Sequence, residues 1–414
     1  MKFIAKQDPE IYQALKKELA RQREGLELIP SENFASEAVL EALGSVPTNK
    51  YSEGYIGKRY YGGCENIDVI EGLAIERAKK LFGAEHVNVQ PLSGAPANII
   101  VYSALLQPGD TVLGMDLSHG GHLTHGHPVT WMAKIFNFVR YKTDAEGKID
   151  LANLRQMAIE HKPKIILVGY SAYSREIKYE AIKKIADEIG AITMADIAHI
   201  AGLIAGGQMN NPVPIFDVVT TTTHKTLRGP RGAMIMCKEK FAAAIDKAVF
   251  PGLQGGPHEN NIAGIAVALA EAATPEYKEY ARQIKANAKI LEEEFNQRGY
   301  KLCFGGTDNH MLLIDVTPKG VGGKQAQIAL DQAGITINKN MIPDDTRSPF
   351  DPSGIRLGTP ALTTRGMKEN EMHLVAELID KVICNIDNDE VKAEVKKQVK
   401  ELTDKFPLYP GMEY

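Results

Sequence analysis

A single lysine, Lys225, follows a run of threonines, Thr220–Thr223, and is itself followed by the Gly/Pro-rich turn Arg228–Gly232. The apolar run Ile215–Val219 ahead of the threonines predicts a strand, so Lys225 is expected just past a strand end. A lysine held there by its backbone can form a Schiff base with a carbonyl compound, such as the aldehyde of pyridoxal phosphate. Most lysines are solvated surface residues. The neighbours of Lys225 must therefore decide its role.

An acidic residue ends the preceding predicted strand, Ala191–Asp196, which follows a helical pattern closed by Gly190. In an open α/β sheet the ligand crevice lies outside the carboxyl ends of the strands. A carboxylate at that place can pair with a pyridine nitrogen and keep it protonated, because opposite charges favour each other's charged form. The alternative role of Asp196 is to cap a helix over Ile197–Ile200.

Two further strand ends carry polar residues. The run Val87–Gln90 leads to Ser93 and Gly94, which open a helical pattern and suit a phosphate group, because free amides and the helix dipole meet there. Ser93 as a plain N-cap is compatible with that role. The run Ile165–Val168 leads to Ser171. We therefore expect Ser93, Ser171, Asp196 and Lys225 to approach one crevice.

Strand and helix patterns alternate through most of the chain, which predicts an α/β fold with a mostly parallel central sheet flanked by helices. The pattern changes near residue 275 to a long charged helix, followed by two strand candidates and C-terminal helices. We expect an N-terminal arm and large α/β domain over 1–275 and a smaller α+β domain over 276–414. The predicted elements are helices over Ile67–Phe82, Asp150–His161, Tyr179–Ile189, 276–298 and from Glu369 onward, and strands over Thr111–Met115, Ala233–Met236, Met311–Val316 and Ile335–Asn338.

Composition is that of a soluble enzyme. The chain has 414 residues and a formal net charge of −4. Acidic and basic residues are mixed along it, which disfavours a dedicated nucleic-acid binder. The first ten residues lack the apolar core of a signal peptide and no later run spans a bilayer, so the cytoplasm is expected. The four cysteines form no C-x-x-C pair, which predicts neither disulfides nor a structural zinc.

Closely spaced histidines at 119, 122, 125 and 127 suggest a rival metal site and a hydrolase. Glycines interleave them, which indicates a loop, and no Cys or carboxylate lies inside the cluster to complete a ligand set. An imidazole can instead stack on an aromatic plane, and glycines let a flat ligand approach the backbone. We therefore expect no metal.

Ordered motifs along nearly the whole chain resemble those of the bacterial type of serine hydroxymethyltransferase, a fold-type-I pyridoxal-phosphate transferase related in fold to aspartate aminotransferase. The matching segments are Leu28–Asn33, Asn49–Tyr55, Arg59–Gly63, Gly120–Gly126, Asp196–His199, the lysine segment, Gln254–Pro257, Gly306–His310 and Arg356–Gly366.

By this resemblance, Lys225 holds pyridoxal phosphate, Asp196 faces its ring nitrogen, and His122 stacks on its ring. The resemblance also implies further cofactor contacts from Ser171, His199, Ser93, Gly94 and Tyr51, and from Gly255 and Gly256 of a second subunit. For the amino-acid substrate it implies Arg356, Ser31, Tyr61 and Glu53, with Tyr51, Glu53 and Tyr61 coming from the partner subunit of a homodimer. Catalytic roles fall to Lys225, Glu53, His122, Asp196, Tyr61 and His224.

The implied reaction is the reversible conversion of L-serine and tetrahydrofolate to glycine and 5,10-methylenetetrahydrofolate, through an external aldimine and a quinonoid. Folate contacts implied by the resemblance are Leu117, Gly121, Leu123, Asn340, Ser348, Pro349 and Phe350. The sequence departs from the commonest bacterial pattern at His127, Thr130–Ala133, Asp344 and Thr346, and two of these regions adjoin the folate contacts. The alternatives are a folate-independent aldolase for threonine-like β-hydroxy amino acids and a non-enzymatic or metal-based role of the histidine loop.

Overall fold

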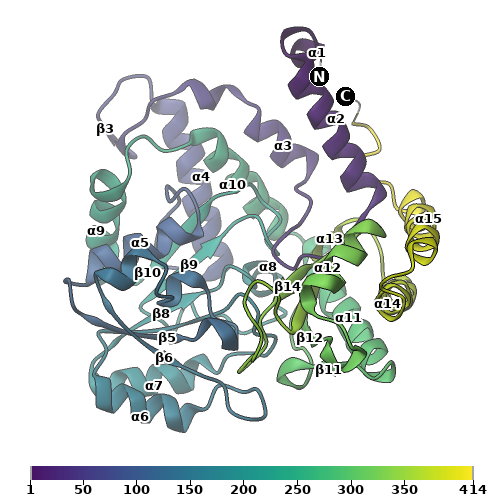
Figure 1. The fold of residues 1–414 in the computed structure, drawn as a ribbon. Coiled ribbons are helices and arrows are strands. Elements are labelled where there is room, and N and C mark those ends of the chain that lie inside the picture. Colours follow the sequence, from purple (N-terminus) through teal and green to yellow (C-terminus); the bar gives the residue numbers. More distant parts are fainter. Residues whose placement is uncertain (1, 413–414) are drawn as a thin grey trace. The chain divides into compact units, whose positions relative to one another are not determined.

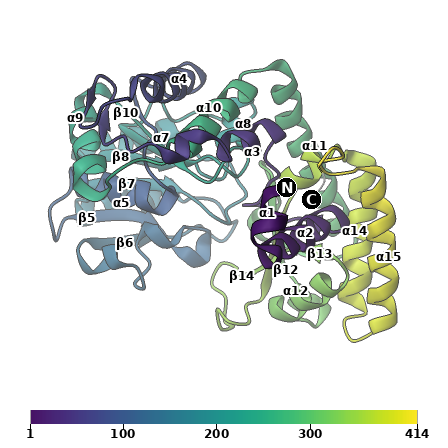
Figure 2. The same ribbon diagram turned by 90° about the horizontal axis from the view of Figure 1, so that it is seen from above.

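The computed structural model describes residues 2–412, which form two compact units (Figures 1 and 2). The larger unit contains residues 33–282; the smaller one contains residues 2–32 together with residues 283–412. This division differs from the predicted units of 1–275 and 276–414. The N-terminal residues group with the C-terminal part, where β1 (Leu26–Glu27) pairs in parallel with β13 (Ile335–Thr336). The second boundary falls inside α11 (Pro275–Gln297).

A seven-stranded sheet forms the centre of the larger unit, in the order β4-β10-β9-β8-β7-β5-β6. Its strands are β4 (His86–Asn88), β5 (Thr111–Met115), β6 (Asn137–Tyr141), β7 (Ile165–Gly169), β8 (Ile192–Asp196), β9 (Val218–Thr222) and β10 (Ala233–Cys237). All pairs from β9 to β6 are parallel, whereas β10 is antiparallel to both β9 and β4. Every residue of β7, β9 and β10 is buried, as in strands covered on both faces. The predicted mostly parallel sheet is confirmed.

Helices flank this sheet, with α6 and α7 lying side by side (Figure 1) and α10 packing on α3 and α4. Asp150 caps α6 by accepting hydrogen bonds from the amides of Ala152 and Asn153, and Gly83 and Gly190 end α4 and α7 in the left-handed conformation. A small hairpin, β2 (Gly54–Tyr55) and β3 (Lys58–Arg59), precedes α4. The helices are α3 (Glu37–Leu43), α4 (Glu65–Phe82), α5 (Gly94–Leu105), α6 (Leu151–His161), α7 (Tyr179–Ile189), α8 (Ala201–Ala205), α9 (Glu239–Lys247) and α10 (Glu259–Ala272).

The strand before the lysine lies further along the chain than predicted. The sequence predicts a strand over Ile215–Val219, but β9 begins at Val218 and includes three of the threonines. The amides of Ile215 and Phe216 both donate to the carbonyl of Pro212, so the start of the predicted run forms a turn instead. Apolar character alone does not separate a buried turn from a strand.

Four strand ends meet at one edge of the sheet. β7, β8 and β9 are parallel, so their carboxyl ends share that edge. β4 is antiparallel to β10, which is antiparallel to β9, so β4 runs in the direction of β9 and ends at the same edge. The sheet therefore brings the segments after β4, β7, β8 and β9 to the edge where ligands bind in open α/β folds.

The smaller unit is an α+β domain. Its antiparallel sheet has the order β11-β12-β15-β14, and its core includes Leu312, Ile314, Ile355 and Leu357 from the two central strands. The strands are β11 (Lys301–Leu302), β12 (Met311–Asp315), β14 (Asn338–Asn340) and β15 (Gly354–Gly358), and the helices are α1 (Lys2–Gln7), α2 (Pro9–Glu24), α12 (Gly323–Gln332), α13 (Pro360–Thr364), α14 (Glu369–Cys384) and α15 (Asp389–Lys405). The predicted strand Ile335–Asn338 is divided between β13 and β14.

One buried arginine ties the chain ends of this unit together. The guanidinium of Arg365, just after α13, donates to five backbone carbonyls, those of Gln22, Arg23, Gly25, Thr403 and Phe406. These carbonyls lie at the ends of α2 and α15, where a helix leaves its last carbonyls without intrahelical partners. Arg365 therefore fastens the end of α2 to the end of α15.

We expect Arg365→Met to lower the free energy of unfolding by about 3 kcal/mol, because several buried carbonyls lose their donors at once. Differential scanning calorimetry of the purified protein measures this as a lower transition temperature of the smaller unit. The exposed Arg155, which pairs only at the surface with Glu188, is a matched control, and Arg155→Met should change the free energy by less than about 0.5 kcal/mol. Equal transition temperatures for Arg365→Met and the unmutated protein would contradict this role.

Candidate active site

The backbone around Lys225 is fixed by hydrogen bonds on both sides. Its carbonyl accepts from Nδ2 of Asn33 at 3.0 Å and from the amide of Arg228 at 3.0 Å. The hydroxyl of Thr226 donates to the carbonyl of His199 at 2.9 Å, and Tyr277 donates to the carbonyl of Thr226 at 2.7 Å. Lys225 itself is half-buried. The segment thus presents a lysine on a rigid backbone three residues beyond β9, as a Schiff-base lysine requires.

Asp196, the last residue of β8, is held by donors on both carboxylate oxygens. Oδ1 accepts from the amide of Ala198 at 3.0 Å, and Oδ2 accepts from Nδ2 of Asn98 at 2.9 Å and from Nε2 of His125 at 3.3 Å. Burial alone raises the pKa of this carboxyl, but the His125 hydrogen bond, the nearby His125 and His122, and Asn98 together hold it well below its usual range. Asp196 is therefore a buried, fixed negative charge.

The histidine loop is built onto the same network. Nδ1 of His122 lies 2.8 Å from the hydroxyl of Thr124 and also accepts from the amide of Thr124. The Thr124 hydroxyl in turn accepts from Asn98, whose own carbonyl oxygen accepts from Thr220 of β9 at 2.7 Å. These bonds fix the plane of the His122 ring relative to Asp196.

The tertiary structure corrects one argument about the histidine loop. No carboxylate lies near these histidines in the sequence, yet single ligand atoms of His122, His125 and Asp196 all lie within 4.8 Å of one another. Asp196 reaches the loop because β8 ends beside it. His125 is hydrogen-bonded directly to Asp196, and His122 is hydrogen-bonded to Thr124. Both histidines therefore have protein hydrogen-bond partners.

The start of α5 has the geometry that suits an anionic group. Ser93 occupies the N-cap position, but its side chain makes no capping hydrogen bond. A β-carbon at Gly94 would lie only 2.6 Å from the methyl group of Thr222 on β9, so glycine is required for this close approach. The first amides of a helix and its dipole suit a phosphate.

His224, next to the lysine, is kept neutral. Burial, followed by the charges of Arg231 and Lys225, lowers its pKa to about 3. Its Nδ1 is buried and has no hydrogen-bond partner among the described residues. A buried polar atom of this kind fits a site that receives a polar ligand.

Three residues expected at the reacting end of a substrate lie together. The hydroxyl of Tyr51 donates to Oε1 of Glu53 at 3.3 Å, and the rings of Tyr51 and Tyr61 meet edge to face at 5.1 Å between centroids. A β-carbon at Gly255 would lie 3.1 Å from Oε1 of Glu53, and one at Gly256 would lie 3.4 Å from the Tyr51 ring. Both tyrosines are exposed.

The other predicted residues are distributed over both units. In the larger unit, the amide of Ser171 donates to the carbonyl of Gly120 at 2.7 Å, His199 is buried, and Leu117, Gly121 and Leu123 lie in or beside the short helices of the histidine loop. The smaller unit carries Ser31, Arg356, Asn340, Ser348, Pro349 and Phe350.

Arg356 lies in the middle of β15 and is buried. Its Nε donates to Oδ1 of Asn338 on the neighbouring strand at 3.0 Å, and the two residues are partners in the strand register. Burial lowers the pKa of Arg356 to about 10, which leaves the guanidinium charged at neutral pH. Asn338 thus orients a buried cation.

Sequence reasoning missed the partners that orient the site residues: Asn98, Thr124, His125 and Asn338. Asn98 lies inside an apolar helical pattern, where a polar residue is a usable signal of a buried contact. Its partners Thr220 and Asp196 are far away in the sequence, so the signal names no partner.

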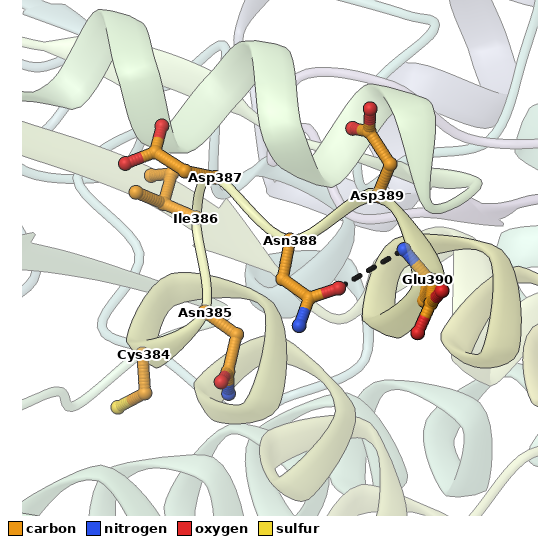
Figure 3. A pocket seen from close by; sticks show the side chains of 7 residues that line it. All are labelled: Cys384, Asn385, Ile386, Asp387, Asn388, Asp389 and Glu390. Carbon is orange, nitrogen blue, oxygen red and sulfur yellow. Dashed lines mark hydrogen bonds between the residues drawn. The ribbon is translucent and has the colours of Figure 1, made fainter.

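Residues 384–390, at the junction of α14 and α15, line one hollow of the smaller unit (Figure 3). Oδ1 of Asn388 accepts from the amides of Glu390 and Val391, so Asn388 is the N-cap residue of α15. None of the predicted site residues lines it. Separately, no helix within residues 2–412 combines the length and the apolar character needed to cross a membrane.

A mostly parallel α/β sheet, a lysine just beyond one strand end, a fixed aspartate at the neighbouring strand end and a helix N-terminus at the same edge are the arrangement typical of fold-type-I pyridoxal-phosphate enzymes. The sequence model of the family described as serine hydroxymethyltransferase matches residues 4–379. The relative named serine hydroxymethyltransferase from Desulfotalea psychrophila (strain LSv54 / DSM 12343) is 55% identical over 414 residues, covering 100% of this chain and 97% of that protein. The chain belongs to the serine hydroxymethyltransferase family, whose members use pyridoxal phosphate with tetrahydrofolate as co-substrate.

Proposed function

We propose that this chain converts L-serine and tetrahydrofolate reversibly to glycine and 5,10-methylenetetrahydrofolate in the cytoplasm, as a homodimer. The observation that carries the proposal is the full-length match to a serine hydroxymethyltransferase, together with the convergence of Lys225 and Asp196 at one sheet edge. Nothing in the described residues favours the folate-independent aldolase. Serine cleavage by the purified enzyme with and without tetrahydrofolate tests the proposal, and cleavage that is indifferent to folate would overturn it.

The larger unit would hold the cofactor through three contacts. Lys225 would bind its aldehyde carbon, Asp196 would accept a hydrogen bond from its ring nitrogen, and His122 would stack on its ring. Bound pyridoxal phosphate supplies an electron sink for the bonds at the substrate α-carbon. The low pKa of Asp196 supports its part, because a carboxylate that stays ionised keeps the opposing ring nitrogen protonated.

The phosphate would bind at the N-terminus of α5, through Ser93 and Gly94, with Gly255 and Gly256 of a second subunit. His199 and Ser171 would lie near the phenolic oxygen of the ring. The free capping position of Ser93 and the close approach of Gly94 to β9 support the phosphate site. His224, which is neutral, would add no charge beside Lys225.

Arg356 would bind the carboxylate of the amino acid, because its planar fork matches two carboxylate oxygens, and Ser31 would line the same end. Tetrahydrofolate would contact Leu117, Gly121, Leu123, Asn340 and the segment 348–350. Asp344 and Thr346 adjoin that segment, and His127 and Thr130–Ala133 lie at and just after the end of the histidine loop, so these departures would change the affinity for folate.

We expect Arg356→Lys to raise the KM for serine by about 100-fold, because a lysine keeps the charge but loses the two-point geometry. The visible absorbance of the bound cofactor should persist, since Asp196 and Lys225 are untouched. Steady-state kinetics and spectra of one preparation measure both effects. Arg155→Lys, at an exposed arginine paired with Glu188, is the control and should leave the KM for serine unchanged. An unaltered KM in Arg356→Lys would remove the arginine from the site.

Tyr51, Glu53 and Tyr61 would act in the partner's site, together with Gly255 and Gly256. Support comes from their grouping: the glycine pair and the Tyr51–Glu53 pair lie against each other within one chain, so they can be delivered together. Each of the two sites of a symmetric dimer would then need both chains.

Co-expression of a Lys225→Ala chain with a Glu53→Gln chain tests this arrangement. A heterodimer would contain one site with both changes and one site with neither, so its activity should recover to about half that of the unmutated dimer. Each homodimeric variant alone should have almost none. Isolated heterodimers that bind cofactor but stay inactive would show that Lys225 and Glu53 serve the same chain's site.

A further inference from the structure

A buried ionic cluster surrounds Arg59 in the larger unit, next to the segment that carries Glu53. Nε of Arg59 donates a hydrogen bond to Oδ1 of Asp68 at 2.8 Å, and its NH2 group donates one to Oε2 of Glu71 at 2.8 Å. NH1 donates to two backbone carbonyls, those of Ser52 at 2.9 Å and Gly54 at 3.0 Å. The two carbonyls flank Glu53 in the sequence. The guanidinium therefore clamps the backbone on both sides of that residue.

A further buried acid, Glu259, joins the cluster from a different element, α10. It is the first residue of α10, only 1% exposed, and its Oε1 accepts from the hydroxyl of Ser52 at 2.6 Å. Its Oε1 lies 4.0 Å from NH1 of Arg59, whose hydrogens already serve the two carbonyls. Oε2 of Glu259 is buried and has no hydrogen-bond partner among the described residues. Its one side-chain hydrogen bond within that part of the chain is thus the one from Ser52.

This bond joins two segments that are far apart in the sequence. Glu259 lies three residues after Gly256, and Ser52 directly precedes Glu53. The amide of Tyr60 donates to the carbonyl of Glu53 at 3.0 Å, so the segment is also held from the β2–β3 hairpin. Because Oε1 of Glu53 lies beside Gly255, a shift of the Ser52 segment relative to α10 would move the carboxylate away from the glycine loop.

We propose that Glu259 is a positioning residue that joins the Ser52–Gly54 segment to the start of α10, and so sets the Glu53 carboxylate in register with the Gly255–Gly256 loop. Its importance for activity rests on the proposed function, in which both segments act in the same shared site. Its importance for the fold of the segment does not.

Burial and the charges around Glu259 make its protonation sensitive to pH. The charged groups of the cluster are Arg59 from β3 and Asp68 and Glu71 from α4, so one cation already faces two carboxylates. Burial raises the pKa of Glu259 to about 7, against the lowering effect of the Ser52 hydrogen bond. The folded pKa exceeds the ordinary value of 4.5. The contribution of this group to stability is therefore complete below pH 4.5 and is lost as the pH rises through about 7.

Three variants separate the hydrogen bond from the charge. Glu259→Gln keeps an acceptor for Ser52 and never ionises, whereas Glu259→Ala and Ser52→Ala both remove the bond. Glu276→Gln, an exposed change in the next helix, is the matched control. In the holoenzyme we expect amide hydrogen exchange in the 51–61 segment to rise about tenfold in Glu259→Ala and Ser52→Ala, because one buried hydrogen bond is lost. Glu276→Gln should leave this exchange unchanged.

Activity and pH provide the second measurement. With serine and tetrahydrofolate, Glu259→Ala should lower kcat about tenfold while the KM for serine changes less than about twofold, because the carboxylate of the substrate is bound elsewhere. Glu259→Gln should retain activity at pH 6, because its amide oxygen still accepts a hydrogen bond from Ser52. If the unmutated enzyme fails to turn over serine, the proposed function fails and the exchange measurement still decides the positioning role.

The inference is overturned if exchange in the 51–61 segment is the same in Glu259→Ala as in the unmutated holoenzyme. It is also overturned if Glu259→Gln is as damaging as Glu259→Ala at pH 6, because the glutamine keeps the bond to Ser52. Should Glu259→Ala fail to fold, Ser52→Ala removes the same bond and leaves the buried acid in place, so its exchange rate gives the answer.

Discussion

Replacing Lys225 with alanine is expected to reduce serine turnover on the order of 10⁴-fold, because the proposed Schiff-base amine is lost and alanine offers no group to replace it. The fold should survive, since the neighbouring structure is held by the carbonyl of Lys225, which alanine keeps. Steady-state turnover and circular dichroism of the purified variant measure the two effects.

Reduction of the holoenzyme with borohydride supplies an independent check on Lys225. The cofactor should become attached to the peptide that contains this lysine, as peptide mass analysis would show. Lys148→Ala, a change at an exposed lysine paired only at the surface, should neither lose turnover nor alter the labelled peptide. Label recovered on another lysine would refute the assignment.

Replacing Asp196 with asparagine should lower kcat about 10²- to 10³-fold, because the fixed charge that we propose to face the ring nitrogen disappears while the shape is kept. The folded pKa of Asp196 is lowered, so the unmutated enzyme should keep its charge at Asp196 throughout the range above the ordinary pKa of 3.8. The loss in Asp196→Asn should therefore be nearly constant between pH 6 and pH 9. Turnover rates at several pH values, with cofactor spectra of the same samples, give the result.

The exposed Asp187, paired with Lys183 on α7, is the matched control, and Asp187→Asn should leave turnover unchanged. His125→Asn is a milder change for comparison with Asp196→Asn. It leaves Asp196 in place but removes the strongest of the interactions that lower the Asp196 pKa. A fully active Asp196→Asn enzyme would exclude the proposed contact with the ring nitrogen.

Local sequence patterns determined the elements that carry the site. The helix over Tyr179–Ile189 and the strand over Thr111–Met115 lie where the periodicity predicts them, and the apolar run that ends in Asp196 does form β8. Each of these patterns is complete within a short stretch of chain, so the side chains themselves report their burial. The order of motifs from residue 28 to 366 was sufficient to recognise the family.

Tertiary structure alone decided which side chains meet. The pairing of His125 and Asn98 with Asp196 depends on the order of strands in the sheet, and the grouping of residues 2–32 with the C-terminal part depends on the pairing of β1 with β13. The bond between Ser52 and Glu259 joins residues 207 positions apart. Such contacts leave no periodic mark in the sequence, because they arise from the path of the backbone through space. The same path buries Glu259 at the start of α10, and this burial raises its pKa.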